Sequence, residues 1–169
     1  MRWIAFLLLF FDTSPRDTLK PGLLGEYFDI GRPSADFPDF AKLRPTLTRV
    51  DANLDFEGTQ ECWKGTKLRD YFAVRWTGFI DIPTTGTWTI GCDSDDGSRV
   101  TLDDKLLVEN GGLHAMREAT GNVDLRKGAH KIRVEFFENE VFAGIRLSWG
   151  LKSKPLLIVP PEALRHAAR

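Results

Sequence analysis

The chain has 169 residues, of which 42% are hydrophobic and 28% charged, with a formal net charge of −1 at pH 7. This length and composition suit one soluble domain with a sizeable core. The near-zero charge excludes the basic field expected of proteins that bind nucleic acid or anionic membranes. Three histidines and two cysteines without a CxxC motif argue against a structural zinc site.

Residues 1–19 differ from the rest of the chain in composition. We interpret them as an apolar N-terminal segment followed by a polar linker. The apolar run at residues 3–11 follows Met1 and Arg2 and is too short for a membrane span, which needs about 20 apolar residues. Its charge and length fit the core of a signal peptide, but a small-x-small cleavage site is missing. A short segment that docks on the domain is the alternative, and both interpretations stay open.

Residues 20–166 show the pattern of a β domain. Short runs of alternating apolar and polar residues are separated by turn residues, and no stretch has sustained helical periodicity. The expected strands are residues 22–28, 47–50, 72–82, 87–91, 99–102, 106–108, 123–125, 130–136, 145–149 and 156–159, before a short helical turn at 162–165. We therefore expect an all-β fold, an antiparallel β-sandwich or barrel-like module with long loops, the longest within residues 29–60.

An acidic turn lies between two of these strands. Asp93, Asp95 and Asp96 fall within four positions and are followed by Gly97. Adjacent carboxylates repel unless a positive charge lies between them, and calcium, a hard cation with oxygen ligands, is the first candidate. A solvated acidic hairpin turn explains the same residues. An EF-hand loop fits poorly, because Gly97 falls fifth when counted from Asp93 and the flanks are strand-like.

Trp63 and the two cysteines are further candidates for a functional or structural role. Trp63 stands in a polar loop and is the best tryptophan candidate for an exposed sugar platform, although a core position is favoured. Cys62 and Cys92 could pair in an exported protein, but Cys92 follows the strand period and is expected to be a buried, unpaired residue.

Several motifs follow one another in an order typical of one family. They occupy residues 22–28, 72–80, 85–90, 94–100, 102–103, 123–130, 132–138 and 145–149. The most diagnostic is the Ser-Asp-Asp-Gly-Ser element at residues 94–98. Across about residues 20–166 the chain resembles the protective-antigen fourteen-kilodalton domain family, which occurs in a bacterial toxin component, yeast flocculin-type adhesins and some β-glucosidases.

The resemblance implies a calcium-dependent carbohydrate-binding module of an exported or cell-surface protein. In the adhesin members two aspartates joined by a cis peptide hold a calcium ion, which binds sugar hydroxyls directly. The metal ligands carried over are Asp95, Asp96, Glu138 and Asn139. The carbohydrate-binding residues expected here are Asp95, Asp96, Asn139, Phe142, Asn110 and His114, the last two from a loop that could approach the acidic turn or be merely solvated.

Val141 and Phe142 depart from the family pattern, which has small residues there; they could narrow the pocket or form an apolar wall for a sugar ring. The alternative function is a structural or protein-interaction module without sugar binding. No nucleophile elbow, phosphate loop or metal-hydrolase helix is found, so we expect no enzyme, although the module could accompany one. The expected partners are a glycan or polysaccharide and other domains of a longer protein, with no nucleic acid and no membrane span.

Overall fold

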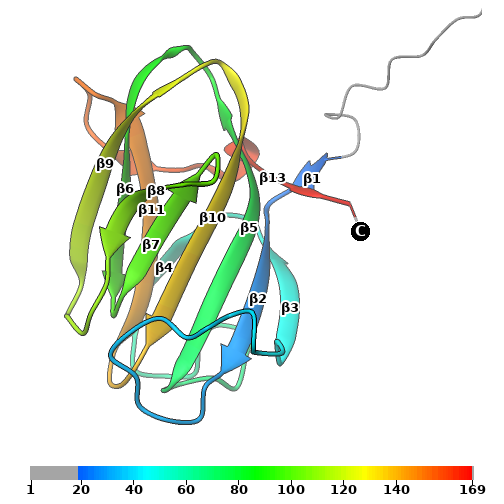
Figure 1. The fold of residues 1–169 in the computed structure, drawn as a ribbon, viewed down its shortest axis with the longest axis vertical. Helices are drawn as coiled ribbons and strands as arrows, with labels where there is room; N and C mark the ends of the chain where they lie inside the picture. Colours follow the sequence, from blue (N-terminus) through cyan, green and yellow to red (C-terminus); the bar gives the residue numbers. More distant parts are fainter. Residues whose placement is uncertain (1–18, 169) are drawn as a thin grey trace, which may run out of the picture.

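The computed structural model describes residues 19–168, which form two antiparallel β-sheets packed as a sandwich (Figure 1). The first sheet runs in the order β1 (Leu19–Pro21), β13 (Leu164–Ala167), β5 (Phe72–Ile82), β10 (Gly128–Glu138), β7 (Ser98–Leu102) and β8 (Lys105–Asn110), and β2 (Leu23–Asp29) and β3 (Leu47–Asp51) extend it beside β5. The second sheet contains β12 (Leu157–Ile158), β11 (Ala143–Leu151), β6 (Gly86–Asp95) and β9 (Arg117–Leu125), with β4 (Asp55–Thr59) paired to β11. The expected all-β antiparallel sandwich is confirmed.

The core lies between the sheets and is built from alternate residues of each strand. In β10, Ile132, Val134 and Phe136 point inward and are at most 1% exposed, while Arg133 between them faces solvent. In β6, Trp88, Ile90 and Cys92 do the same from the other sheet (5% exposed or less). This period-two burial is the pattern that the sequence predicted.

Trp63 belongs to this core, which confirms the favoured core position over an exposed sugar platform. The residue is 1% exposed and its ring packs 5.5 Å, centroid to centroid, from both Phe72 and Phe136. Cys92 is fully buried, and burial raises the pKa of its thiol to about 12. Cys62 is exposed and both cysteines are free.

The element bounds differ from expectation mainly in strands that are half exposed. β4 was not predicted, and β9 begins six residues before the expected strand at residues 123–125. Both strands lie at sheet edges, where β4 has a single large apolar residue, Phe56, and the inward face of β9 begins with the small residues Ala119 and Gly121, so their hydrophobic alternation is weak. The helical turn expected at residues 162–165 is a 3-10 turn that begins one residue earlier, η2 (Pro161–Ala163). Leu164 and Arg165 instead begin β13, which, like β1, was not predicted. The apolar run at residues 3–11 lies outside the described residues.

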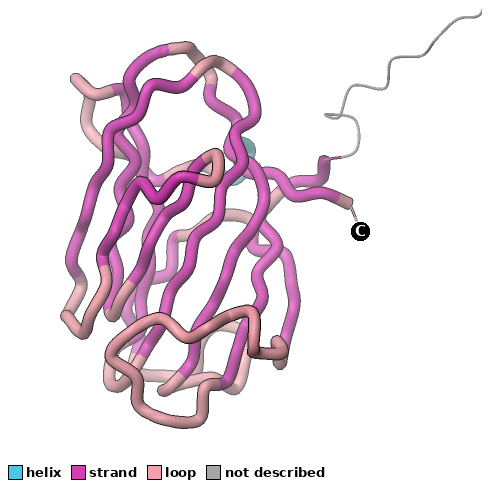
Figure 2. Tube along the Cα trace, in the orientation of Figure 1, coloured by secondary structure: helices cyan, strands magenta, loops and turns pink. Residues whose placement is uncertain are grey.

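The long connection between β2 and β3 crosses the outer face of the first sheet, at the lower end in Figure 2. It carries a second, smaller apolar cluster in which Phe40 and Phe37 pack on Phe28, Ala73 and Phe137. The Phe37 and Phe137 rings meet edge to face with centroids 5.1 Å apart. This connection is therefore anchored beside the end of β10.

Several strand ends meet at this end of the sandwich. β6 ends at Asp95 and β10 ends at Glu138, while Gly144 near the start of β11 pairs with Asp95. β8 ends nearby at Asn110, which pairs with Ser98. Segments far apart in the sequence thus bring their connecting loops together. Within residues 19–168 no helix is long and apolar enough to cross a membrane.

Candidate metal and ligand-binding site

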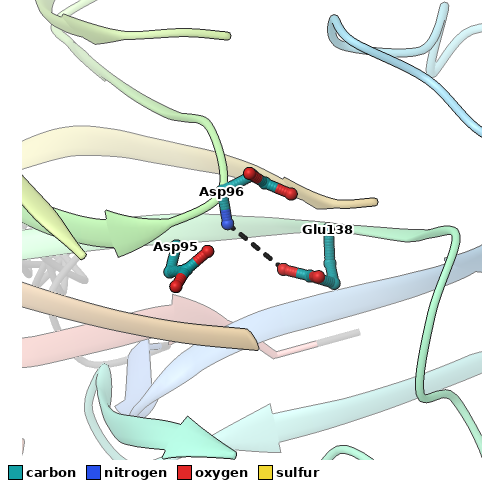
Figure 3. A group of neighbouring side chains, drawn as sticks. All are labelled: Asp95, Asp96 and Glu138. Carbon is teal, nitrogen blue, oxygen red and sulfur yellow. Dashed lines mark hydrogen bonds between the residues drawn. The ribbon is translucent and has the colours of Figure 1, made fainter. Parts of the chain in front are cut away.

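Three carboxylates converge where β6 and β10 end. Asp95, Asp96 and Glu138 each contribute an oxygen, and the three oxygens lie within 4.8 Å of one another (Figure 3). The residues are 9%, 6% and 1% exposed, so little water screens their charges. Oxygens at this spacing can surround one hard cation, whose ligand distances are about 2.3 to 2.6 Å for calcium.

The turn that holds the aspartates is fixed by its neighbours on β10. The peptide bond between Asp95 and Asp96 is cis, as the resemblance implies. Gly97 follows, and its carbonyl accepts a hydrogen bond from the backbone N–H of Phe137 at 2.9 Å. A Cβ on Gly97 would lie 2.3 Å from a carbon of the buried Phe137 ring, so the close approach of this turn to β10 requires glycine.

Asp96 connects the turn to two loops. One carboxylate oxygen accepts the backbone N–H of His114 at 2.9 Å, and the other accepts that of Asn139 at 3.0 Å. The N–H of Asp96 itself donates to Glu138 Oε2 at 3.2 Å. Through one side chain and one amide, Asp96 therefore holds the loop after β8 and the loop after β10 against the acidic turn.

Glu138 carries an unsatisfied oxygen. Its Oε1 is buried and has no hydrogen-bond partner among the described residues. Burial, together with the nearby charges of Asp96 and Asp95, raises the pKa of Glu138 to about 9. Burial and the charge of Asp96 likewise raise the pKa of Asp95 to about 6. An orphaned buried oxygen among raised-pKa carboxylates is what a group of cation ligands shows without its ion, so these residues fit calcium.

Asn139 lies beside the three carboxylates, as expected from the sequence, but its side chain has another partner. The side-chain oxygen Oδ1 of Asn139 accepts a hydrogen bond from the backbone N–H of Ser34 at 3.0 Å. The backbone carbonyl of Asn139 accepts one from the backbone N–H of Tyr71, also at 3.0 Å. The sequence did not indicate either contact. Ser34 belongs to the long β2–β3 connection, which thereby supports the loop after β10 from outside.

Asn110 has a structural role, and the structure does not support the expected direct sugar contact. The residue is 1% exposed, and its amide donates to Ser94 Oγ at 3.1 Å and to the carbonyl of Arg117 at 2.8 Å. Its Oδ1 accepts from Arg117 Nε at 2.9 Å. All its polar atoms are therefore engaged in closing the loop after β8.

His114 and Phe142 are accessible at the edge of the site. His114 is half-buried, and its ring nitrogens lie 3.0 Å from the carbonyls of Ala115 and Asn110. Phe142 is 45% exposed on the loop after β10. Met116, which the sequence did not single out, lies with its Sδ 3.1 Å from the position that a Cβ on Gly144 would take. Leu113 and Ala115 in the same loop are also apolar, so the residue type of Met116 gave no distinct signal.

Comparison with known proteins agrees with this geometry, since residues 19–162 match the PA14 domain. The chain belongs to the PA14 domain family. This PA14 domain is 30% identical over 153 residues to the anti-sigma-I factor RsgI3 of Acetivibrio thermocellus, covering 88% of the chain but 22% of that protein. The chain thus spans less than a quarter of the curated relative that it matches.

The solved structures that resemble this PA14 domain include an anti-sigma factor protein and a sugar-binding domain. An anti-sigma factor domain-containing protein from Clostridium clariflavum is 28% identical with a TM-score of 0.73, over 89% of this chain and 48% of that one. The PA14 sugar-binding domain from an RTX adhesin is 18% identical with a TM-score of 0.71, over 87% of this chain and 99% of that one. At this identity the adhesin shows the shared fold alone.

Proposed function

We propose that this PA14 domain is a calcium-dependent carbohydrate-binding module of an exported or cell-surface protein. Asp95, Asp96 and Glu138 would hold the ion, with Asn139 beside them. One observation carries the proposal, namely the convergence of three nearly buried carboxylates around the unpaired Oε1 of Glu138. The sugar-binding adhesin domain of the same fold supports it by analogy.

A bound calcium ion would neutralise the carboxylates and offer coordination positions to sugar hydroxyls, because calcium takes about six to eight oxygens. The residues of the chain prepare this site in the absence of sugar. The hydrogen bonds from His114 and Asn139 to Asp96 fix its carboxylate, and Gly97 lets the turn lie against Phe137. The side chains of the site are therefore held in place before any ligand arrives.

We expect weak binding at each site. Sugar hydroxyls exchange water for protein or ion partners, and the net gain per hydrogen bond is about 1 kcal/mol. A shallow site for one or two sugar units would then bind in the millimolar to high-micromolar range, about −4 to −6 kcal/mol. Stronger attachment would come from several copies acting together.

The second candidate is a structural or protein-interaction module that binds no sugar. The observation in its favour is the similarity to anti-sigma factors, since the name of RsgI3 describes regulation and not sugar binding. In either case we propose a binding module without catalysis of its own, which would work with other domains of a longer protein.

A glycan array with a multimerised form of the chain separates the two candidates. The array is run with calcium and with a chelator, and Glu138→Gln is compared with Asp93→Asn, a change to a neighbouring acid outside the carboxylate cluster. We expect calcium-dependent binding that Glu138→Gln removes and Asp93→Asn keeps. Absence of binding in both conditions would favour the interaction module, and binding unchanged by chelator would rule out the calcium mechanism.

A further inference from the structure

Exposed apolar side chains gather around the carboxylates. Among residues 19–168, seven large hydrophobic side chains are exposed, and four of them lie on the two loops that Asp96 connects. We call these four the apolar rim: Leu113 (52% exposed), Met116 (37%), Val141 (57%) and Phe142 (45%). The other three, Val50, Leu106 and Leu157, are scattered over β3, β8 and β12.

The two loops of the apolar rim approach each other beside the ion site. Leu113 precedes His114, whose N–H binds Asp96, and Phe142 lies three residues after Asn139, whose N–H binds the other Asp96 oxygen. Met116 bridges toward the second loop, because its Sδ lies next to Gly144, the residue that pairs with Asp95. The rim is therefore carried by the two loops that are hydrogen-bonded to Asp96.

No part of the fold requires these side chains to be apolar. None of the four belongs to either core cluster. Val141 has a φ of 83°, a conformation that β-branched residues rarely adopt, so this loop presents valine to solvent at some cost. Contiguous exposed apolar surface on a soluble domain typically marks a ligand-binding or interaction site.

An ion site alone would accept any sugar with two suitably placed hydroxyls. We propose that the apolar rim selects glycans in which the sugar bound at the ion carries an apolar substituent close to its free diol, such as an acyl, alkyl or aryl group. This inference rests on the proposed function. The oxygens of such a ligand would face the carboxylates while its hydrocarbon part is removed from water by the rim.

The test compares methyl and phenyl glycosides of the same hexoses, with glucose, galactose and mannose as the panel. Dissociation constants are measured by NMR titration of the full chain in calcium and in chelator. We expect phenyl glycosides to bind about tenfold more tightly than methyl glycosides, the gain from burying roughly 55 Å² of apolar surface. This gain should appear in calcium only.

Substitutions in the apolar rim test whether its side chains produce the tighter binding of phenyl glycosides. Met116→Ser and Leu113→Ser should reduce the tenfold gain to about twofold or less while leaving the affinity for methyl glycosides nearly unchanged. Leu157→Ser, which alters an equally exposed leucine on β12, should keep the full gain. Equal binding of both glycosides, or a gain that survives in the rim variants, overturns this inference alone. If neither glycoside binds in calcium, the proposed function fails as well.

Discussion

The carboxylate of Asp96 accepts the backbone N–H of Asn139 across 43 positions of sequence, at 3.0 Å. This contact joins the turn after β6 to the loop after β10, and its counterpart from His114 adds the loop after β8. Asp96 thus has two roles, since the side chain that would bind an ion also organises the loops around it. Substitutions at Asp96 and Glu138 should separate these roles.

Calcium should raise the melting temperature of the wild-type chain. A ligand that binds only the folded state adds RT ln(1 + [L]/Kd), about 2.7 kcal/mol at a hundredfold excess over Kd, or roughly 5 to 10 °C for a domain of this size. Thermal melts in excess calcium and in chelator measure the shift. Equal melting temperatures would contradict the calcium site.

Asp96→Ala should abolish the calcium shift and also destabilise the calcium-free protein. The substitution leaves the N–H groups of His114 and Asn139 without their acceptor, which we expect to cost about 1 to 3 kcal/mol of unfolding free energy. Denaturant unfolding in chelator gives this cost. Asp93→Asn is the control and should change neither quantity; an unaltered calcium shift in Asp96→Ala would exclude Asp96 as a ligand.

The calcium-free protein should lose stability at this site as the pH rises. The pKa of Glu138 is about 9 in the fold against 4.5 ordinarily, so the folded state holds this proton more tightly than the unfolded chain. The resulting stabilisation is complete below pH 4.5 and is lost as the pH rises through about 9. Melts in chelator between pH 5 and 9 should show a steeper decline for the wild type than for Glu138→Gln.

Excess calcium should oppose this decline, because a carboxyl group binds the ion only after losing its proton. Calorimetric titration at pH 7 in buffers of different ionisation enthalpy should therefore detect proton release on calcium binding. A heat of binding that is the same in all buffers would show that Glu138 is already ionised in the calcium-free fold.

Gly97→Ala should destabilise the fold by about 1 to 3 kcal/mol, because the added methyl group would overlap the fully buried ring of Phe137. Calcium binding should weaken together with stability, since the same turn carries Asp95 and Asp96. Gly58→Ala is the matched control, because a Cβ at Gly58 would meet no atom within 4 Å. Similar unfolding free energies for the two variants would mean that the turn can move away from β10.

The hairpin between β7 and β8 should contribute stability at acidic pH through His130. Burial lowers the pKa of the ring, but hydrogen bonds to Asp103 and to the Arg126 carbonyl, with the charge of Asp103, outweigh it and raise the pKa. The contribution is therefore complete below the ordinary value of 6.5 and is lost as the pH rises through the folded-state pKa. His130→Gln should lower the melting temperature more at pH 5.5 than at pH 8; an equal loss at both would refute this.

The sequence predicted the long central strands well, because their two faces differ in burial and the alternation is strong. It was weaker for β4 and β9, because β4 has only one large apolar residue and the inward face of β9 begins with small residues. Trp63 is buried although its sequence neighbours are polar. Local composition does not reveal when a loop folds back over an open end of the core.

For the candidate site, the resemblance supplied Asp95, Asp96 and Glu138, which the structure brings together. The supporting contacts could not be read from residue types. Ser34 binds Asn139 through its backbone N–H, which every residue except proline possesses, across 105 positions. The sequence indicated that the loop of Asn110 could approach the acidic turn. Only the fold shows that the side-chain amide of Asn110 points inward and donates to Ser94 and Arg117.

The pairing of Leu19 with Ala167 has a consequence for how the domain is displayed. These two end strands lie beside one another, and β13 joins β5 at Ile80, whereas Glu138 joins the opposite end of β5 at Phe72. Leu19 and Ala167 therefore lie side by side at the end of the first sheet that is away from the carboxylates. A neighbouring domain joined at either of these strands would be attached at this one place. The turn that carries Asp95 and Asp96 would then lie at the opposite end of the domain, away from the attachment point.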